Sequence, residues 1–141
     1  MRLFKLGRII ATNVALFGCV IISIMAYAET KHQVSEAVSV DSHFRVTYQT
    51  QYESVPLNQI HPWILRVEDM EGVAIENAIV TIDGGMPAHN HGLPTEPVAT
   101  ELGGGEYLIE GIKFSMTGSW EMWFYIQTET LVDKVKFELE I

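Results

Sequence analysis

The sequence predicts an all-β protein, an immunoglobulin-like β-sandwich of about seven strands preceded by an N-terminal signal/anchor helix. Three observations lead to this prediction. Apolar and polar residues alternate with a period of two through most of residues 43–141. Turn signals rich in Gly, Pro, Asn and Asp separate these stretches. No helical period is visible after residue 28, and short strands without helices are typical of a sandwich.

The first 28 residues have the pattern of an export signal. Arg2, Lys5 and Arg8 precede a largely apolar run over residues 9–28. The run ends in Ala26-Tyr27-Ala28, a small-x-small pattern that suits signal peptidase. An uncleaved membrane anchor is the alternative, because about 20 apolar residues can cross a bilayer. Both interpretations place the remaining chain outside the cytoplasmic membrane, so we expect a periplasmic or extracytoplasmic domain, either released or anchored.

Residues 29–42 are polar without a sustained period, and we interpret them as a linker to a domain at 43–141. The first predicted strand, 44–53, alternates Phe44, Val46 and Tyr48 with polar residues. Pro56 and Asn58 indicate a turn before the second strand at 63–68. A third strand at 78–82 and a weaker fourth at 98–101 follow.

Three glycines at 103–105 allow the chain to reverse into a fifth strand at 106–111. The sixth has the strongest pattern, because Trp120, Met122, Phe124 and Ile126 share one face. The last strand, 133–141, places Val135 and three further apolar residues opposite lysines and glutamates. The alternation therefore predicts seven strands in two layers.

Charge and cysteine content exclude several classes of function. Residues 29–141 contain six basic and all 18 acidic residues, a net charge of −12 with neutral histidines. So acidic a surface argues against nucleic acid as a partner, because binding phosphates requires Lys and Arg. The only cysteine, Cys19, lies in the apolar run, so the domain has neither disulfides nor thiolate ligands.

The longest irregular segment, 83–95, contains the strongest candidates for a functional site. Met86, His89 and His91 lie within six positions of one another in a stretch rich in Gly and Pro. Imidazole binds both copper oxidation states and thioether sulfur favours Cu(I), so this group suits copper. If the loop is locally extended, His89 and His91 face the same side. Met116 precedes the Thr117-Gly118 turn and is a candidate fourth ligand from the same end of the sandwich.

Each of these residues also has a structural interpretation. Histidines with glycine and proline occur in ordinary loops, and Met86 can close the edge of the sandwich. From its position alone we favour core packing over ligation for Met116, and core packing is also the role we assign to Met122. His43 and His61 each stand alone near a strand start, where surface or hydrogen-bonding roles are common.

The sequence contains no motif of a familiar enzyme class. It has no G-x-S-x-G, no P-loop, no H-E-x-x-H and no G-x-G-x-x-G opening a helix. We therefore expect a protein that is not an enzyme.

Three motifs in order resemble a known family. They are Met86-Pro87-x-His89-x-His91-Gly92, Gly105-x-Tyr107 and Phe114-x-Met116-x-Gly118-x-Trp120. Together they resemble the YtkA-like/FixH-like exported domains, over residues 44–141. The resemblance implies an immunoglobulin-like sandwich similar in shape to CopC-type copper proteins. It implies copper as the cofactor, with Met86, His89, His91 and Met116 facing the metal and Trp120 in a structural role.

The resemblance also implies partners, because FixH-like proteins are linked to the assembly of copper-containing respiratory oxidases. The leading hypothesis is an exported copper-binding or copper-delivery domain, accessory to a membrane metalloenzyme or a copper-handling protein. The second hypothesis is a metal-free interaction module that docks an envelope complex. It would use Trp123 and Tyr125, which alternate with the core residues of their strand and so face outward.

Overall fold

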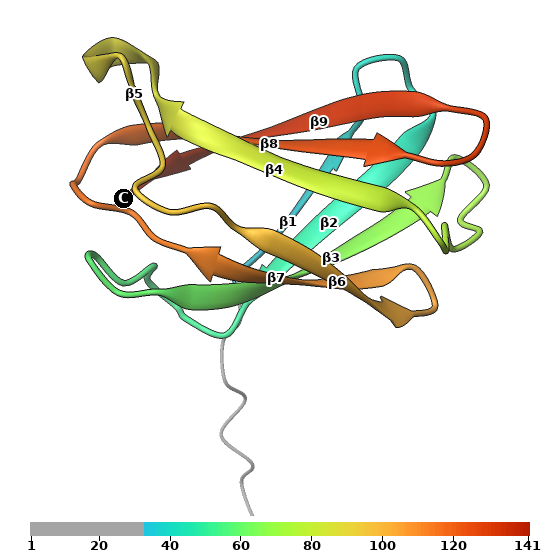
Figure 1. Cartoon of the computed structure of the whole chain (residues 1–141), viewed down its shortest axis with the longest axis horizontal. Coiled ribbons are helices and arrows are strands. Elements are labelled where there is room, and N and C mark those ends of the chain that lie inside the picture. Colours follow the sequence, from blue (N-terminus) through green and yellow to red (C-terminus); the bar gives the residue numbers. More distant parts are fainter. Residues whose placement is uncertain (1–32) are drawn as a thin grey trace, which may run out of the picture.

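The computed structural model describes residues 33–141, which form two antiparallel sheets packed face to face (Figure 1). One sheet has the order β1-β2-β3-β7-β6 and the other β5-β4-β8-β9. The elements are β1 (Gln33–Val38), β2 (Phe44–Thr50), β3 (His61–Asp69), β4 (Ile79–Met86), the 3-10 helix η1 (Pro87–His89), β5 (His91–Gly92), β6 (Val98–Gly103), β7 (Glu106–Ile112), β8 (Ser119–Gln127) and β9 (Val132–Glu140). The predicted β-sandwich is confirmed.

The core lies between the two sheets and is made by the alternating apolar residues of the inner strands. Tyr48 of β2 stacks on Trp63 of β3 with 4.3 Å between ring centroids, and it meets Phe137 of β9 edge-on at 4.9 Å. Met122 and Phe124 of β8 are fully buried in this layer, which confirms the core role expected for Met122. Each large apolar side chain so buried contributes about 1.5–3 kcal/mol to folding.

Residues 33–141 form nine strands where seven were predicted, because β1 and β5 were not expected, and β4 is longer than predicted. β1 occupies residues 33–38, which the sequence had assigned to the linker, and it pairs with β2 along its whole length. It lies at the sheet edge with mostly exposed residues, so it carries no apolar alternation for sequence analysis to find. β4 extends to Met86, four residues beyond the predicted end at 82, and the two-residue β5 pairs with this extension.

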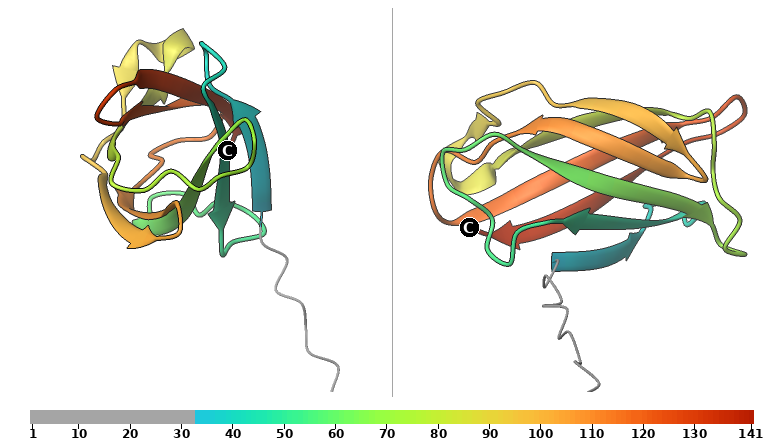
Figure 2. Two further views of the ribbon diagram at one scale, coloured as in Figure 1. Left: turned by 90° about the vertical axis from the view of Figure 1, so that its right-hand side faces the viewer. Right: turned by 90° about the horizontal axis from the view of Figure 1, so that it is seen from below.

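The segment that contains the predicted ligands closes one end of the sandwich. In Figure 1, β4 and β7 end there, β3 and β8 begin there, and the C-terminus lies at the same end of the sandwich. Figure 2 shows the two layers end-on and the 3-10 helix standing out from the β4 sheet. The predicted signal or anchor at 1–28 lies outside the described residues. Within residues 33–141 no helix has the length and apolar character needed to span a bilayer.

Candidate metal centre

The predicted ligand loop is a tight β4–η1–β5 reversal. Pro87 starts a single 3-10 turn, and Asn90 ends it in the left-handed conformation at φ 52°. β5 then returns along β4, with Gly85 opposite Gly92 and Met86 opposite His91. The condition of a locally extended loop is therefore not met, because the 3-10 turn intervenes. The rings of His89 and His91 nevertheless lie 6.1 Å apart between centroids.

Glycine at position 85 allows β5 to lie this close to β4. A Cβ atom on Gly85 would come within 2.5 Å of the His91 carbonyl oxygen, a distance that side-chain carbons do not tolerate. At Gly92, by contrast, the nearest atom to an added Cβ is 3.4 Å away, an ordinary contact. Because residue 85 has no side chain, His91 can lie in its observed position beside β4.

The His91 imidazole is held from two sides. Its Nδ1 atom lies 3.1 Å from the Gly92 carbonyl oxygen, to which it can only donate a hydrogen, because a carbonyl oxygen is an acceptor. In the neutral ring this leaves an unprotonated Nε2 atom, which lies 3.4 Å from the Met116 Sδ atom. Trp120 supports both residues: its ring meets the His91 ring edge-on at 5.5 Å, and its Nε1–H donates to the Met116 carbonyl at 3.1 Å.

The two methionines of the predicted site differ in exposure. Met116 is 40 % exposed, so the alternative of core packing is wrong for this residue. Met86 is 1 % exposed, and its terminal methyl lies 2.8 Å from where a Cβ on Gly118 would stand. Met86 also faces the same side of the sheet as His91, because directly opposed residues of antiparallel strands share a face. His89 is exposed on the 3-10 helix.

The structure thus brings His91 and Met116 into contact, with the His89 ring beside them and Met86 behind them in the core. A hollow of about 340 Å³ on the outer side of β4 and β5 borders this group and is lined partly by Met86, His91, Asp83 and Glu121. A hydrogen bond from the Lys136 ammonium lowers the pKa of Glu121 below its ordinary value, so this carboxylate is held as an ion pair at the rim.

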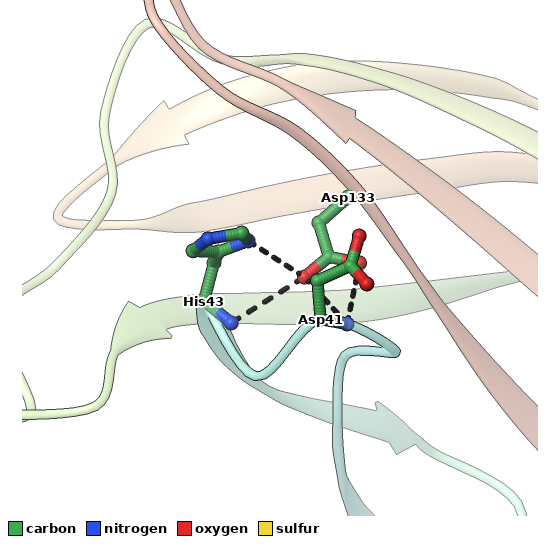
Figure 3. A group of neighbouring side chains, drawn as sticks. All are labelled: Asp41, His43 and Asp133. Carbon is green, nitrogen blue, oxygen red and sulfur yellow. Dashed lines mark hydrogen bonds and ion pairs between the residues drawn. The ribbon is translucent and has the colours of Figure 1, made fainter.

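A second group of polar side chains, which the sequence analysis missed, lies at the β1–β2 turn. Asp41, His43 and Asp133 place ligand atoms within 4.8 Å of one another (Figure 3). The Asp133 carboxylate accepts hydrogens from the Ser39 hydroxyl at 2.6 Å, from three backbone N–H groups and from the His43 ring. These donors occupy both of its oxygens, so the arrangement favours a role in holding the turn to β9 over a role in binding a metal.

Asp133 itself shows why the group is stable. Its side chain is 1 % exposed, and burial by itself would raise its pKa. The hydrogen bonds from Ser39 and from the backbone of Lys134, Asp41 and His43 outweigh burial and lower the pKa to about 2. The sequence contained one signal for this position. Asp133 lies two and four residues before the core residues Val135 and Phe137, so it is on the same inward face of their strand.

Of the other residues expected at the surface, His61 and Trp123 are more buried than predicted. His61 is 1 % exposed, so the surface role is wrong, and its Nδ1 donates to the Gln59 carbonyl at 3.1 Å. Burial lowers its pKa, although this hydrogen bond partly opposes the shift. Trp123 is half-buried rather than exposed, with the Lys134 and Lys136 ammonium groups 5.0 and 5.6 Å from its ring. Tyr125 is exposed as expected.

Comparisons with known proteins place these motifs in a family. Searches of curated proteins and of solved structures gave no match. Among protein-family models, the one described as YtkA-like matches residues 36–123. The matched region begins within β1 and contains Met86, His89, His91 and Met116, together with the glycines that position them. Since this region covers more than half of the chain, the protein belongs to the YtkA-like family.

Proposed function

We propose that this protein is an exported copper-binding or copper-delivery domain that binds Cu(I) through Met86, His89, His91 and Met116. The observation that carries the proposal is the 3.4 Å approach of the His91 Nε2 atom to the Met116 Sδ atom. With Nδ1 donating to a backbone carbonyl, Nε2 offers its lone pair toward a second soft donor. A donated Nδ1–H of this kind is the usual companion of a metal-binding imidazole.

The separation of these two atoms suits one shared ion. Bonds of about 2.0 Å to imidazole nitrogen and about 2.3 Å to sulfur are typical of tetrahedral metal sites. Their sum exceeds 3.4 Å, so a single ion can touch both donors in a bent arrangement. Met86 is the next donor, because it is the cross-strand neighbour of His91. A site of thioether and imidazole donors without thiolate or carboxylate favours Cu(I) over harder cations.

Exposure of the site supports delivery rather than permanent storage. Met116 and His89 lie at the surface, while Met86 lies in the core. Two exposed ligands can exchange with those of a partner while the buried ligand still holds the ion. The leader-like sequence over residues 1–28 supports export, and a membrane metalloenzyme or a copper-handling protein is the proposed recipient.

A competition titration tests the proposal. The full chain, purified in mild detergent, is titrated with Cu(I) against a colorimetric chelator, alongside the double variant His89→Ala/His91→Ala. We expect binding of one Cu(I) that the double variant lowers by about 100-fold or more, since two ligands are lost. The matched control is His43→Ala, which removes a part-exposed histidine at the Asp133 group. If instead His43→Ala alone abolishes binding, the metal site is at Asp133 and the proposal is wrong.

A metal-free docking module remains the second proposed function, and one observation favours it. Tyr125 is 37 % exposed on the outer face of the β4–β8–β9 sheet, next to Trp123 and its two lysines. Aromatic side chains are enriched at protein interfaces. Tyr125→Ser should then abolish co-purification with an envelope complex and leave Cu(I) binding unchanged. Retained co-purification counts against this alternative.

A further inference from the structure

Residues 33–141 contain four methionines in two very different environments. Met70 and Met116 are 39 % and 40 % exposed, whereas Met86 and Met122 are 1 % and 0 % exposed. Met70 follows β3, at the opposite end of the sandwich from His91 (Figure 1). Met116 differs from it in having the His91 Nε2 atom 3.4 Å from its sulfur. Residues 33–141 therefore contain two equally exposed thioethers, of which one lies at the candidate metal site.

Exposed thioethers react with peroxides by a defined two-electron step. The sulfur lone pair attacks one peroxide oxygen, the O–O bond breaks, and an S–O bond forms. For hydrogen peroxide the other oxygen leaves as water, so the sulfur is oxidised and the peroxide is reduced. The product is a sulfoxide, which is polar and which methionine sulfoxide reductases return to the thioether. Buried sulfurs are shielded from this attack.

We propose that Met116 is a site of reversible sulfoxidation, and that its oxidation switches off metal binding at His91; this rests on the proposed function. Oxidation uses a sulfur lone pair and leaves an oxygen as the outermost donor. Oxygen is a hard donor and favours cations other than Cu(I). The close pair of imidazole nitrogen and soft sulfur is therefore lost, while the buried Met86 keeps its thioether.

The same contact makes metal and peroxide compete for Met116. An ion bound between His91 and Met116 uses one of the two sulfur lone pairs, withdraws electron density from the other and shields the sulfur, so the sulfur becomes a poorer nucleophile toward peroxide. Metal binding should therefore protect Met116, and it should leave Met70 unaffected because that residue lies at the other end of the molecule. Met70 is the internal control, since its exposure is almost identical.

The first experiment measures protection with Ag(I), a soft cation that stands in for Cu(I) and that peroxide does not oxidise. The full chain, with and without one equivalent of Ag(I), is treated with hydrogen peroxide, and sulfoxide at each methionine is followed by peptide mass spectrometry. Without metal, we expect Met70 and Met116 to oxidise faster than Met86 and Met122. Ag(I) should slow Met116 about tenfold or more and leave the Met70 rate unchanged. Equal Met116 rates with and without bound Ag(I) would overturn the inference.

The second experiment measures the consequence for affinity. Cu(I) competition is repeated on Met70→Leu, which retains Met116, after peroxide treatment and removal of the peroxide. We expect affinity to fall about tenfold or more and to recover after treatment with methionine sulfoxide reductases. Met116→Leu should bind Cu(I) with the same reduced affinity before and after peroxide treatment, because it has no thioether at position 116 to oxidise. If the untreated chain binds neither metal, the proposed function fails and this inference with it. If it binds Cu(I) equally well before and after Met116 is oxidised, only this inference fails.

Discussion

Met86 and His91 are directly opposed across the β4–β5 pair, five positions apart in the chain and on the same face of the sheet. This pairing turns the His91 ring back toward the sandwich, where it meets Trp120 and the Met116 sulfur. A two-residue strand therefore determines where the candidate site is built. The close backbone approach that makes the strand possible leads to the first prediction.

Gly85→Ala should displace β5 and weaken Cu(I) binding. The new Cβ would lie 2.5 Å from the His91 carbonyl oxygen, so β5 must move away from β4 and take His91 with it. We expect a loss of about tenfold or more in Cu(I) affinity and about 1–3 kcal/mol in stability from overpacking. Chelator competition and thermal unfolding measure the two effects. Gly92→Ala is the matched control, with its nearest atom at 3.4 Å; equal affinities for the two variants would contradict the prediction.

Asp133→Asn should remove an acid-sensitive part of the stability. The folded-state pKa of about 2 lies below the ordinary value of 3.8, so the unfolded chain binds the proton first as pH falls. The contribution is fully present above pH 3.8 and is lost as pH falls toward 2. It amounts to about 2.5 kcal/mol, at about 1.36 kcal/mol per pKa unit. Urea unfolding between pH 6 and pH 2 measures it.

The comparison with wild type isolates this residue from the other carboxylates. Asp133→Asn should be less stable than wild type at pH 6, and the difference should shrink as the pH approaches 2. Asp41→Asn is the control, since the Asp41 backbone N–H rather than its side chain bonds Asp133. A difference between Asp133→Asn and wild type that is constant with pH would refute the assignment.

His61→Phe should flatten the stability profile near neutral pH. Burial lowers the pKa of His61, so protonation is easier in the unfolded chain. In the wild type, the contribution of neutral His61 to the free energy of unfolding is complete above pH 6.5. It declines as the pH falls below 6.5, by at most about 1.4 kcal/mol per pH unit. Phenylalanine cannot titrate, and it fits among Tyr52, Trp63 and Phe114, which surround the ring. Unfolding between pH 7.5 and pH 5 tests this; parallel curves for the two proteins would contradict it.

Most of the core could be predicted from the sequence because it depends on local alternation. Phe124 and Phe137 were placed correctly from the period of two within their own strands. β1 could not be found in this way. Most of its residues are exposed, and its stability comes from pairing with β2, which is a tertiary interaction.

The candidate site was predictable in composition but not in geometry. The spacing of His89 and His91 identified the loop, yet the 3-10 turn between them depends on Pro87 and on Asn90 in a left-handed conformation. The contact between His91 and Met116 joins residues 25 positions apart, and only the order of the strands brings them together. Ser39 and Asp133, 94 positions apart, were missed because no local pattern links them.

Met86→Leu should separate ligation by Met86 from its packing. Leucine conserves the volume of methionine, and such exchanges in a core cost less than about 1.5 kcal/mol. It lacks the sulfur, however, so Cu(I) affinity should fall about tenfold or more if the thioether binds the metal. Met122→Leu is the matched control, because Met122 is equally buried on the neighbouring strand β8 and is not among the proposed ligands. Chelator competition with thermal unfolding distinguishes the roles. A fall in affinity for Met86→Leu alone, at unchanged stability, assigns Met86 to the site, whereas equal affinities for both variants would leave Met86 as a core residue and reduce the site to His89, His91 and Met116.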